Sequence, residues 1–467
     1  MNEDTMDGDN IGDLRVLVAS LLPDAGHLTP LFQIGRRLQQ HGAEVCALIP
    51  AEAEGLVQQF GIPYQLLGTV LPDKRGMLLK RLSNAGDFSR ALIREASFHA
   101  EYILPLTANG IGFFPELAEQ AESFEPNLIL ADAHIFSQEY RELASRVDCP
   151  LVMHYSKGNH YYLQQPELWS RNRSRWTMKC LRTLRKMSSP LHYKLTKYLF
   201  PEEFKKQREM SGYVREFRAG YGKRATKSAS VTEITTGIAV LEKIHLAGRI
   251  NTWNGQVKIF GPMEPVISWK GGEKLQQWLD LQHELSVPVV FLAFGTMVGI
   301  PEGKATRIAK VAVAQGCRVL VAGRDRIKSL LPLESTGDLY WSDWVPQVAV
   351  LDHPAVKGFI SHGGSTSVQE ALWFGKPILC VPVLWDQFYS SWIAEQLGFG
   401  VWADGIGSPR RSVHWKVDKL INDSTIRTRA VALSLEIRRH PGDLEVVEEL
   451  ACVARASKKE WNQFGSG

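Results

Sequence analysis

The sequence predicts an α/β protein with two doubly wound domains, and three observations lead to this prediction. The chain has 467 residues, more than one hydrophobic core usually organises, so two or three domains are expected. Apolar residues make up 44% of the chain and charged residues 22%, as in soluble globular proteins. Apolar runs of strand length alternate with helical patterns from residue 14 and again from residue 288, which predicts two parallel sheets with helices on both faces.

Strand-like runs in the first half of the chain end in side chains that can take part in proton transfer. The apolar run LRVLVASLL at 14–22 is followed by the turn PDAGH and by a segment at 28–42 that is apolar at helical spacing. His27 follows the first strand, and Asp132 closes the later strand NLILAD. Because the carboxyl ends of parallel strands meet at one edge of a sheet, we expect both residues at that edge. The other strands expected in this half are 43–50, 60–67, 149–155 and 256–265.

Residues 157–227 interrupt this alternation and carry much positive charge. They hold 18 Lys and Arg residues against 5 Asp and Glu, a net charge of +13 in a chain whose total is +4. Parts such as WTMKCLRTLRKM can be drawn as a basic amphipathic helix. A solvated charged face is the commonest explanation of such a run, and an acidic or amphiphilic acceptor or an anionic membrane surface is the alternative. No nucleic-acid-binding motif accompanies the charge, so nucleic acid is not expected as a partner.

The second alternation begins at PVVFLAFGT, residues 288–296, and leads to the stretch 344–387. The centre of this stretch, FISHGGSTSVQEAL, reads as an apolar strand, a loop of small residues carrying His362, and a helix. Such a turn leaves backbone N–H groups unpaired at a helix N-terminus, where the macrodipole favours an anion and glycines let it approach the main chain. We interpret the turn as a seat for a diphosphate.

Side chains on either side of this turn suit a base and a polyol. Trp344 offers an aromatic plane and Gln347 an amide, while the Asp-Gln pair at 386–387 can hydrogen-bond to hydroxyl groups. Each residue also has a plainer explanation: S-x-x-E at 367–370 fits a capping box, the Trp a core or rim aromatic, and the Asp a helix cap. The order and spacing of the whole set favour a ligand site over these explanations.

With its motifs in this order, the stretch 344–387 resembles the signature box of the nucleotide-sugar-dependent glycosyltransferases of family 1, which have the GT-B fold. The motifs W-x-P-Q, H-x-G, S-x-x-E and D-Q are kept with the family's spacing. The resemblance implies two doubly wound Rossmann-like domains facing across a cleft. It places an acceptor-binding domain at 1–262, with the basic stretch as a helical insertion, and a donor-binding domain at 263–448. A C-terminal helix at 449–467 would return to the first domain.

The resemblance also implies which residues bind the donor. In the family the Trp stacks on uracil, the Gln and Glu contact the ribose, the His and a following Ser bind the pyrophosphate, and the Asp-Gln pair holds the sugar hydroxyls. VVFLAFGT resembles the family's strand and Gly-Ser/Thr loop, which contributes to diphosphate binding. Ser365 and Thr366 stand where the plant version of the box has Trp and Asn. The implied donor-binding residues are Trp344, Val345, Gln347, His362, Gly364, Ser365, Thr366, Ser367, Glu370, Asp386, Gln387, Gly295 and Thr296.

A second resemblance concerns the residues at the edge of the first sheet. G-H-x-x-P, with Gly26, His27 and Pro30, resembles the family's catalytic-His motif, and Asp132 matches the Asp that holds this His. A His near a helix N-terminus is biased towards the neutral imidazole, which can accept a proton, and a carboxylate can fix its tautomer. For His27 alone, a loop residue at a helix start is the simpler explanation. Its pairing with Asp132 and the signature box favours a general base with an orienting partner.

Together these resemblances imply an inverting UDP-dependent hexosyltransferase. The sugar would be glucose, from UDP-glucose as co-substrate, by family analogy with Gln387, and the acceptor a hydroxyl of a small or amphiphilic molecule. Single displacement would convert an α-linked donor into a β-glycoside. No cofactor and no metal are expected, because the helix N-terminus, His362 and backbone amides take the role of a divalent ion. A GT-B epimerase or hydrolase of nucleotide sugars and a non-catalytic nucleotide-sugar-binding protein stay open as alternatives.

The first residues, the lengths of the apolar runs and the cysteines predict the compartment of the protein. The first fourteen residues are polar and acidic, and no apolar run is long enough to span a bilayer. The six cysteines lie far apart and lack metal-ligand spacing, so we expect them to be reduced. A cytoplasmic location is the expectation that follows.

Overall fold

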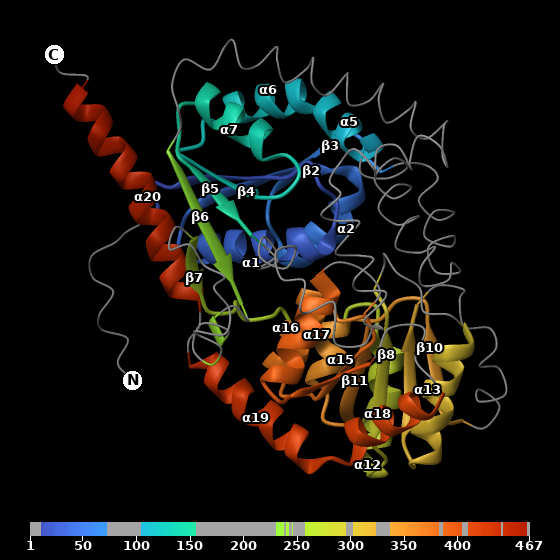
Figure 1. Ribbon diagram of the computed structural model, residues 1–467. Helices are drawn as coiled ribbons and strands as arrows, with labels where there is room; N and C mark the ends of the chain where they lie inside the picture. Colours follow the sequence, from blue (N-terminus) through green and yellow to red (C-terminus); the bar gives the residue numbers. More distant parts are fainter. Residues whose placement is uncertain are drawn as a thin grey trace, which may run out of the picture.

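The computed structural model contains two parallel β-sheets, one for each alternation in the sequence (Figure 1). The predicted fold class, an α/β protein with two doubly wound sheets, is confirmed. The basic segment, Thr296 and the side chain of Asp386 lie outside what the structure describes. The described residues are 11–71, 104–155, 230–237, 240–241, 245, 257–295, 302–323, 337–382, 386–403, 410–439 and 442–464.

The first sheet has seven strands in the order β3-β2-β1-β4-β5-β6-β7, and every neighbouring pair is parallel. Its strands are β1 (Arg15–Ala19), β2 (Glu44–Pro50), β3 (Tyr64–Leu67), β4 (Leu128–Asp132), β5 (Leu151–His154), β6 (Val231–Thr236) and β7 (Val257–Phe260). The helices described with it are α1 (Ala25–Gln40), α2 (Glu54–Val57), α5 (Leu104–Gly112), α6 (Phe114–Phe124) and α7 (Ser137–Arg146), with 3-10 turns at Ala51–Ala53 and Gln58–Phe60.

Strand β1 shows why the first sheet carries helices on both faces. Its side chains alternate between the faces, as they must along a pleated strand. Val16 and Val18 pack in the core cluster that contains Leu31 of α1, while Leu17 packs on the opposite face with Leu117 of α6. The strand is buried on both sides, and its nearly continuous apolar run is the sequence pattern of such a strand.

The second sheet repeats this architecture with six parallel strands in the order β10-β9-β8-β11-β12-β13. Its strands are β8 (Val289–Ala293), β9 (Arg318–Ala322), β10 (Leu339–Ser342), β11 (Val356–Ser361), β12 (Ile378–Cys380) and β13 (Gly400–Trp402). Its helices are α12 (Glu273–Glu284), α13 (Glu302–Ala314), α15 (Gln347–Asp352), α16 (Ser365–Trp373), α17 (Asp386–Gln396), α18 (Arg410–Asn422) and α19 (Ser424–Arg438).

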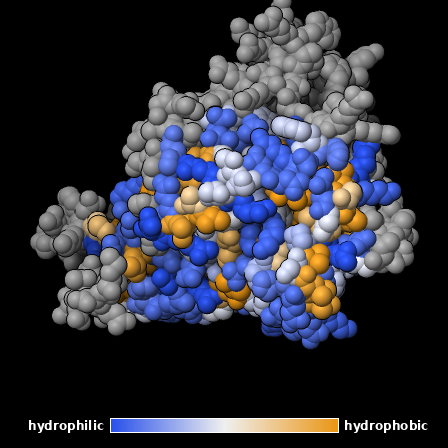
Figure 2. Space-filling view, turned by 90° about the horizontal axis from the view of Figure 1, so that it is seen from below, coloured by the Kyte–Doolittle hydropathy of each residue, from blue (hydrophilic) through white to orange (hydrophobic). Residues whose placement is uncertain are grey.

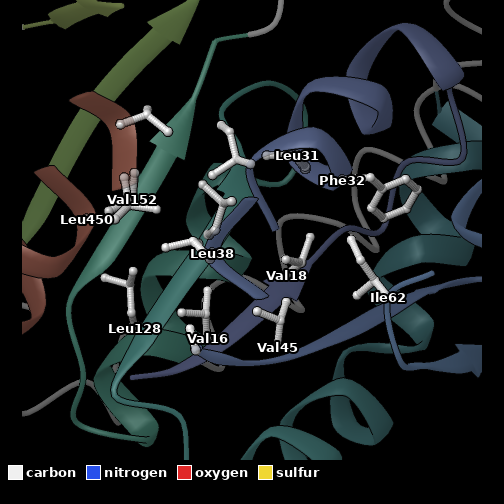
Figure 3. Packing of buried hydrophobic residues seen from close by; sticks show 14 of the residues in the cluster. Val16, Val18, Leu31, Phe32, Leu38, Val45, Ile62, Leu128, Val152 and Leu450 are labelled. Carbon is white, nitrogen blue, oxygen red and sulfur yellow. The ribbon is translucent and has the colours of Figure 1, made fainter. Parts of the chain in front are cut away.

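The last helix, α20 (Gly442–Phe464), packs on the first sheet, although it follows the second one in the chain. Figure 3 shows Leu450 of α20 beside Val152 of β5, and both belong to the core cluster of the first domain. A salt bridge of 3.2 Å joins Arg37 to Asp443 near the start of the helix. The sequence places the start of this helix at residue 449, and the structure begins it at Gly442, with acidic residues in the first turn that suit the helix dipole.

Two close backbone approaches join the domains. A Cβ atom on Gly442 would lie 2.1 Å from the carbonyl oxygen of Gly261, so the two chain segments that connect the domains touch where neither has a side chain. A Cβ atom on Gly237, just after β6, would lie 2.4 Å from Oε1 of Gln369 on α16. The carboxyl edge of the first sheet therefore meets the helix that follows β11.

The surface seen in Figure 2 is mostly hydrophilic, with apolar side chains in separate small groups. Within the part of the chain that the structure describes, no helix has the length and apolar character needed to cross a bilayer.

Candidate functional site

Both sheets have a topological switch point, where the strand order turns from one direction to the other. In the first sheet it lies between β1 and β4, and in the second between β8 and β11. Ligands of open α/β sheets bind outside the carboxyl ends of the strands at such points. The residues after β1 and at the end of β4 include His27 and Asp132, and those after β8 and β11 include Gly295 and His362.

At the first switch point, His27 and Asp132 form a buried pair. His27 lies in the first turn of α1, which Asp24 caps by accepting a hydrogen bond from the Gly26 N–H at 2.8 Å. Asp132 is the last residue of β4. Nδ1 of His27 lies 2.8 Å from Oδ1 of Asp132, and the two residues are 7% and 2% exposed. The structure thus brings together two residues that are 105 positions apart in the sequence.

The charge state of Asp132 fixes the tautomer of His27. Burial would raise the pKa of Asp132, but the charges and hydrogen bonds of His27 and His134 hold that pKa well below its usual range. The carboxylate is therefore ionised and can only accept, so the His27 Nδ1–H donates. The Nε2 atom is then the position at which His27 can take a proton, as a general base requires.

Sequence reasoning missed a second histidine on the same carboxylate. Nδ1 of His134 lies 3.2 Å from Oδ1 of Asp132, and its backbone N–H donates to Oδ2 at 3.1 Å. The rings of His27 and His134 stand edge to face, with centroids 4.3 Å apart. The only signal in the sequence was the short spacing of two residues between Asp132 and His134.

A third histidine, His154, ends the neighbouring strand β5 and is fully buried. Its Nε2 lies 3.0 Å from the hydroxyl oxygen of Thr236, while its Nδ1 has no hydrogen-bond partner among the described residues. Burial lowers the pKa of His154 to about 3, so the ring is neutral. Asp132, His154 and Thr236 thus form a polar row along the carboxyl edge of β4, β5 and β6.

The same cluster holds the one described group of residues whose atoms suit a metal ion. The relevant atoms of His27, Asp132 and His134 lie within 4.8 Å of one another. Both imidazole Nδ1 atoms, however, lie at hydrogen-bonding distance from the same carboxylate oxygen. Protons on the two nitrogens account for this arrangement without an ion.

At the second switch point, glycines bring the backbone close to one imidazole. Gly295 follows β8 with a φ of 66°, and a Cβ atom there would lie 2.8 Å from the ring of His362. A Cβ atom on Gly364 would lie 2.7 Å from Nε2 of the same ring. Gly363 has a φ of 80°, and its Cβ would lie 2.6 Å from the Ser391 hydroxyl. Only glycines let this turn fold as it does.

The turn leads directly into α16, whose N-cap residue is Gly364 and which has no side-chain cap. The capping-box explanation of Ser367 and Glu370 is therefore wrong, because Ser367 lies inside the helix. Ser365 is the first helical residue and Thr366 the second, and the Ser365 hydroxyl oxygen is buried without a hydrogen-bond partner among the described residues. The unpaired N–H groups of such a helix start suit an anion.

Gln347, Ser367 and Glu370 come together beside this helix start. The Gln347 amide donates to Oε2 of Glu370 at 2.6 Å and to the Ser367 hydroxyl at 3.3 Å. Burial raises the pKa of Glu370 to about 7, even though the hydrogen bond from Gln347 lowers it. The carboxyl group therefore changes charge near neutral pH, where a bound hydroxyl group would favour its ionised form.

The remaining predicted donor residues differ in exposure. Trp344 lies between β10 and α15 with 53% of its surface exposed, whereas the adjacent Val345 is buried in the core of the second domain. Gln387, in the first turn of α17, is 5% exposed, and its carbonyl accepts a hydrogen bond from the Ser391 hydroxyl at 2.5 Å. Trp344 thus presents a large aromatic surface to the solvent, three residues before Gln347 in the chain.

Comparison with known proteins finds a family model that matches much of the second domain. Residues 276–441 match the family described as UDP-glucoronosyl and UDP-glucosyl transferase. Part of the chain is 33% identical to the solanidine UDP-glucose glucosyltransferase 1 of Solanum tuberosum, over 31% of the chain and 32% of that protein. Another match, to the anthocyanidin 3-O-glucosyltransferase 2 of Manihot esculenta, is 38% identical over 28% of the chain and 43% of the relative. The chain thus matches 32% of the length of the first relative and 43% of the second, less than half of either.

Solved structures resemble the whole chain. The glycotransferase of kitacinnamycin is similar with a TM-score of 0.62 and 17% identity, covering 94% of this chain and 98% of that one. The glycosyltransferase SnogD from Streptomyces nogalater is similar with a TM-score of 0.58 and 15% identity, covering 94% and 99%. At such identities the likeness shows the fold, which is GT-B.

Proposed function

We propose, from the match of residues 276–441 to the family described as UDP-glucoronosyl and UDP-glucosyl transferase, that the chain is an inverting UDP-sugar glycosyltransferase acting on a hydroxyl group. The observation that carries the proposal beyond the second domain is the buried hydrogen bond between His27 and Asp132 at the first switch point. It supplies an oriented proton acceptor at the sheet edge that meets α16. A protein that only binds nucleotide sugars needs no such acceptor.

In the proposed donor complex, each part of the UDP-sugar has a partner. Uracil stacks on the exposed face of Trp344, and the ribose hydroxyls donate to Glu370, which Gln347 holds in place. The diphosphate lies at the start of α16, where the Ser365 hydroxyl has no hydrogen-bond partner among the described residues and where the first N–H groups of a helix are left without intrahelical partners. His362, Thr366, Ser367, Gly295 and Thr296 complete the diphosphate seat, and Asp386 and Gln387 bind the sugar hydroxyls.

The proposed reaction is one displacement at the anomeric carbon. The acceptor oxygen attacks this carbon opposite the diphosphate while its proton passes to Nε2 of His27. The bond between the carbon and the diphosphate oxygen breaks, and UDP leaves with the electron pair. The helix N-terminus and backbone N–H groups stabilise the charge that develops on the leaving group. Attack from the opposite side inverts the anomeric centre, so an α-linked donor gives a β-glycoside.

The printed names of the relatives support a proposal for the chemical class of both substrates. Two of them are named as glucosyltransferases of solanidine and of anthocyanidins, and a third as a nuatigenin 3-beta-glucosyltransferase. We therefore propose glucose as the transferred sugar and a small hydroxylated ring compound as the acceptor. The basic segment 157–227 is a candidate border of the acceptor entrance, through amphiphilic or anionic acceptors or through an anionic membrane surface.

A donor panel followed by an acceptor screen tests the proposal. UDP-glucose, UDP-galactose, UDP-glucuronate and UDP are first compared for their ability to raise the melting temperature, since a ligand that binds only the folded state stabilises it. The best donor is then incubated with hydroxylated steroids and flavonoids, and glycosides are identified by mass spectrometry. Release of free sugar without any glycoside would indicate a hydrolase. A changed sugar in the recovered donor would indicate an epimerase, and UDP binding without turnover a binding protein.

A further inference from the structure

The second imidazole on Asp132 belongs to a residue that the proposed transfer reaction does not yet use. We propose that His134 is a positioning residue. Its ring N–H donates to the same Asp132 oxygen that accepts the hydrogen bond of His27. This sharing weakens the interaction between the carboxylate and a protonated His27, so that His27 stays neutral down to lower pH. The inference rests on the proposed function, in which neutral His27 takes the proton of the acceptor.

The geometry makes Asp132 the common acceptor of three N–H groups. Oδ1 lies 2.8 Å from Nδ1 of His27 and 3.2 Å from Nδ1 of His134, and Oδ2 accepts the backbone N–H of His134 at 3.1 Å. Asp132 is 2% exposed, so these groups rather than bulk water solvate its charge. Because an ionised carboxylate only accepts, both imidazoles carry their protons on Nδ1.

Sharing one oxygen changes how strongly His27 holds an additional proton. An imidazolium on His27 is stabilised by the full negative charge of a nearby carboxylate. A second N–H donor on the same oxygen partly neutralises its negative charge. The carboxylate therefore stabilises the His27 imidazolium less than an unshared carboxylate would. If His134 itself becomes charged, its ring, 4.3 Å from the His27 ring between centroids, adds like-charge repulsion. Both effects act in the same direction and favour neutral His27.

Other titratable groups around Asp132 do not supply this effect, because most of them stay neutral. On β5, His154 has its pKa lowered to about 3 by burial. On α7, burial raises the pKa of Tyr140 above its usual range. Tyr155, after β5, has a pKa raised to about 12 by burial and by Glu233 of β6, to which its hydroxyl donates. Asp24, at the start of α1, caps its own helix.

The test is the dependence of kcat/KM on pH with a hydroxyl acceptor, for the wild type, His134→Leu and His134→Asn. Leucine removes the ring N–H, whereas the side-chain amide of asparagine can place an N–H close to the former Nδ1. We expect His134→Leu to move the acidic limb of the profile to higher pH by about one unit. At a given pH on that limb, kcat/KM should then be about tenfold lower than in the wild type. His134→Asn should keep the limb within about 0.3 unit of the wild type, since it restores the donor.

Two results would overturn the inference: an unmoved acidic limb in His134→Leu, or an equal shift in both variants. Melting temperature and UDP affinity are measured for each variant, because a merely structural role would change these and leave the limb in place. If His134→Leu does not fold, His134→Gln replaces it, since its longer amide reaches the Nε2 position rather than Nδ1. A wild type that transfers no sugar from any UDP-sugar would instead sink the proposed function.

Discussion

The two switch points occupy equivalent places in two sheets whose strand orders agree except for the additional strand β7 of the first, yet one site is built of side chains and the other mainly of backbone. The first is made of side chains: His27, Asp132 and His134 converge from α1, β4 and the turn after β4. The second is made largely of backbone: Gly295, Gly363 and the N-terminus of α16 meet where side chains would collide.

The difference follows from what each site has to do in the proposed reaction. A proton can be taken only by a titratable group, and such a group needs a partner that fixes its tautomer. A diphosphate needs several donors around it at once, and backbone N–H groups supply them without loss of side-chain entropy. One topology therefore serves two kinds of chemistry. Substitutions at each switch point can test whether side chains carry the function of the first site and the backbone that of the second.

The largest expected effect is that of His27→Ala at the side-chain site. Transfer to a hydroxyl acceptor should fall by about 10²–10⁴-fold, which is the usual contribution of a general base, while UDP affinity persists. The measurement is kcat with an alcohol and with a thiol acceptor. A thiol that is already ionised needs no base, so the variant should lose far less of its activity with the thiol acceptor than with the alcohol. Equal losses with both acceptors would assign His27 to positioning, and Asp132→Ala should cost less than His27→Ala.

Trp344→Ala tests the rim of the donor site. Stacking of a base on an aromatic ring contributes about 1–3 kcal/mol, so UDP affinity should fall by about tenfold or more. Isothermal titration measures the UDP affinity, and Trp341→Ala is the matched control, because Trp341, on β10, is also an exposed tryptophan. Similar losses in both variants, or none in Trp344→Ala, would contradict the stacking.

Gly363→Ala tests the backbone nature of the second site. The left-handed conformation costs a residue with a Cβ about 1–2 kcal/mol, and the new atom would press on Ser391, whose hydroxyl donates to the Gln387 carbonyl. UDP-glucose affinity should fall by about five- to thirtyfold, and the melting temperature should drop. Gly55→Ala is the control, since its Cβ would meet nothing within 4 Å. Unchanged donor affinity would mean that side chains, not the bare backbone, build this site.

The smallest effect concerns Glu370, an ionisable group of the second site whose pKa is raised by burial to about 7. An ionised carboxylate is the better acceptor for ribose hydroxyls, so UDP affinity should rise a few-fold from pH 6 to pH 8. The phosphate of UDP titrates in the same range, and Glu370→Gln corrects for it because only the phosphate contribution should remain. Parallel pH profiles for the wild type and Glu370→Gln would remove Glu370 from ribose binding.

The same raised pKa predicts the opposite trend for stability. The folded domain holds the Glu370 proton more firmly than the unfolded chain, whose glutamates titrate at about 4.3. Its contribution is therefore present below about pH 4 and is lost as the pH rises through about 7. In the absence of ligand, denaturant unfolding of Glu370→Gln should show less loss of stability over this range than the wild type.

The sequence was sufficient for the fold because strand and helix patterns are local. The buried runs that become β1 and β8 and the glycine turn before α16 can be recognised from periodicity and small residues alone. The ordered motifs around His362 predicted a donor site, and the strand ends predicted that His27 and Asp132 share a sheet edge. Their 2.8 Å contact agrees with that expectation, although the catalytic roles stay predictions.

What the sequence could not reveal depends on contacts between strands. His154 meets Thr236 only because β5 and β6 pair in a register that brings their ends together, and no periodic pattern marks either residue. The role of S-x-x-E was ambiguous for a similar reason. Whether Ser367 caps α16 or faces Gln347 depends on where the helix begins, and Gly364 rather than Ser367 takes the N-cap position. The domain boundaries stay predictions as well.

The position of α20 has a consequence for how this protein is made. Val446 and Leu450 belong to the core of the first domain, so that domain obtains some of its core residues from a segment translated after the second domain. During synthesis, the cluster that contains Leu38 and Val152 lacks the side chains of α20 until the whole second domain has been translated. A nascent chain that stops before Gly442 would contain both sheets and still expose an apolar face on the first. Such shortened products should be held by chaperones or degraded, even though they contain every strand of the second sheet.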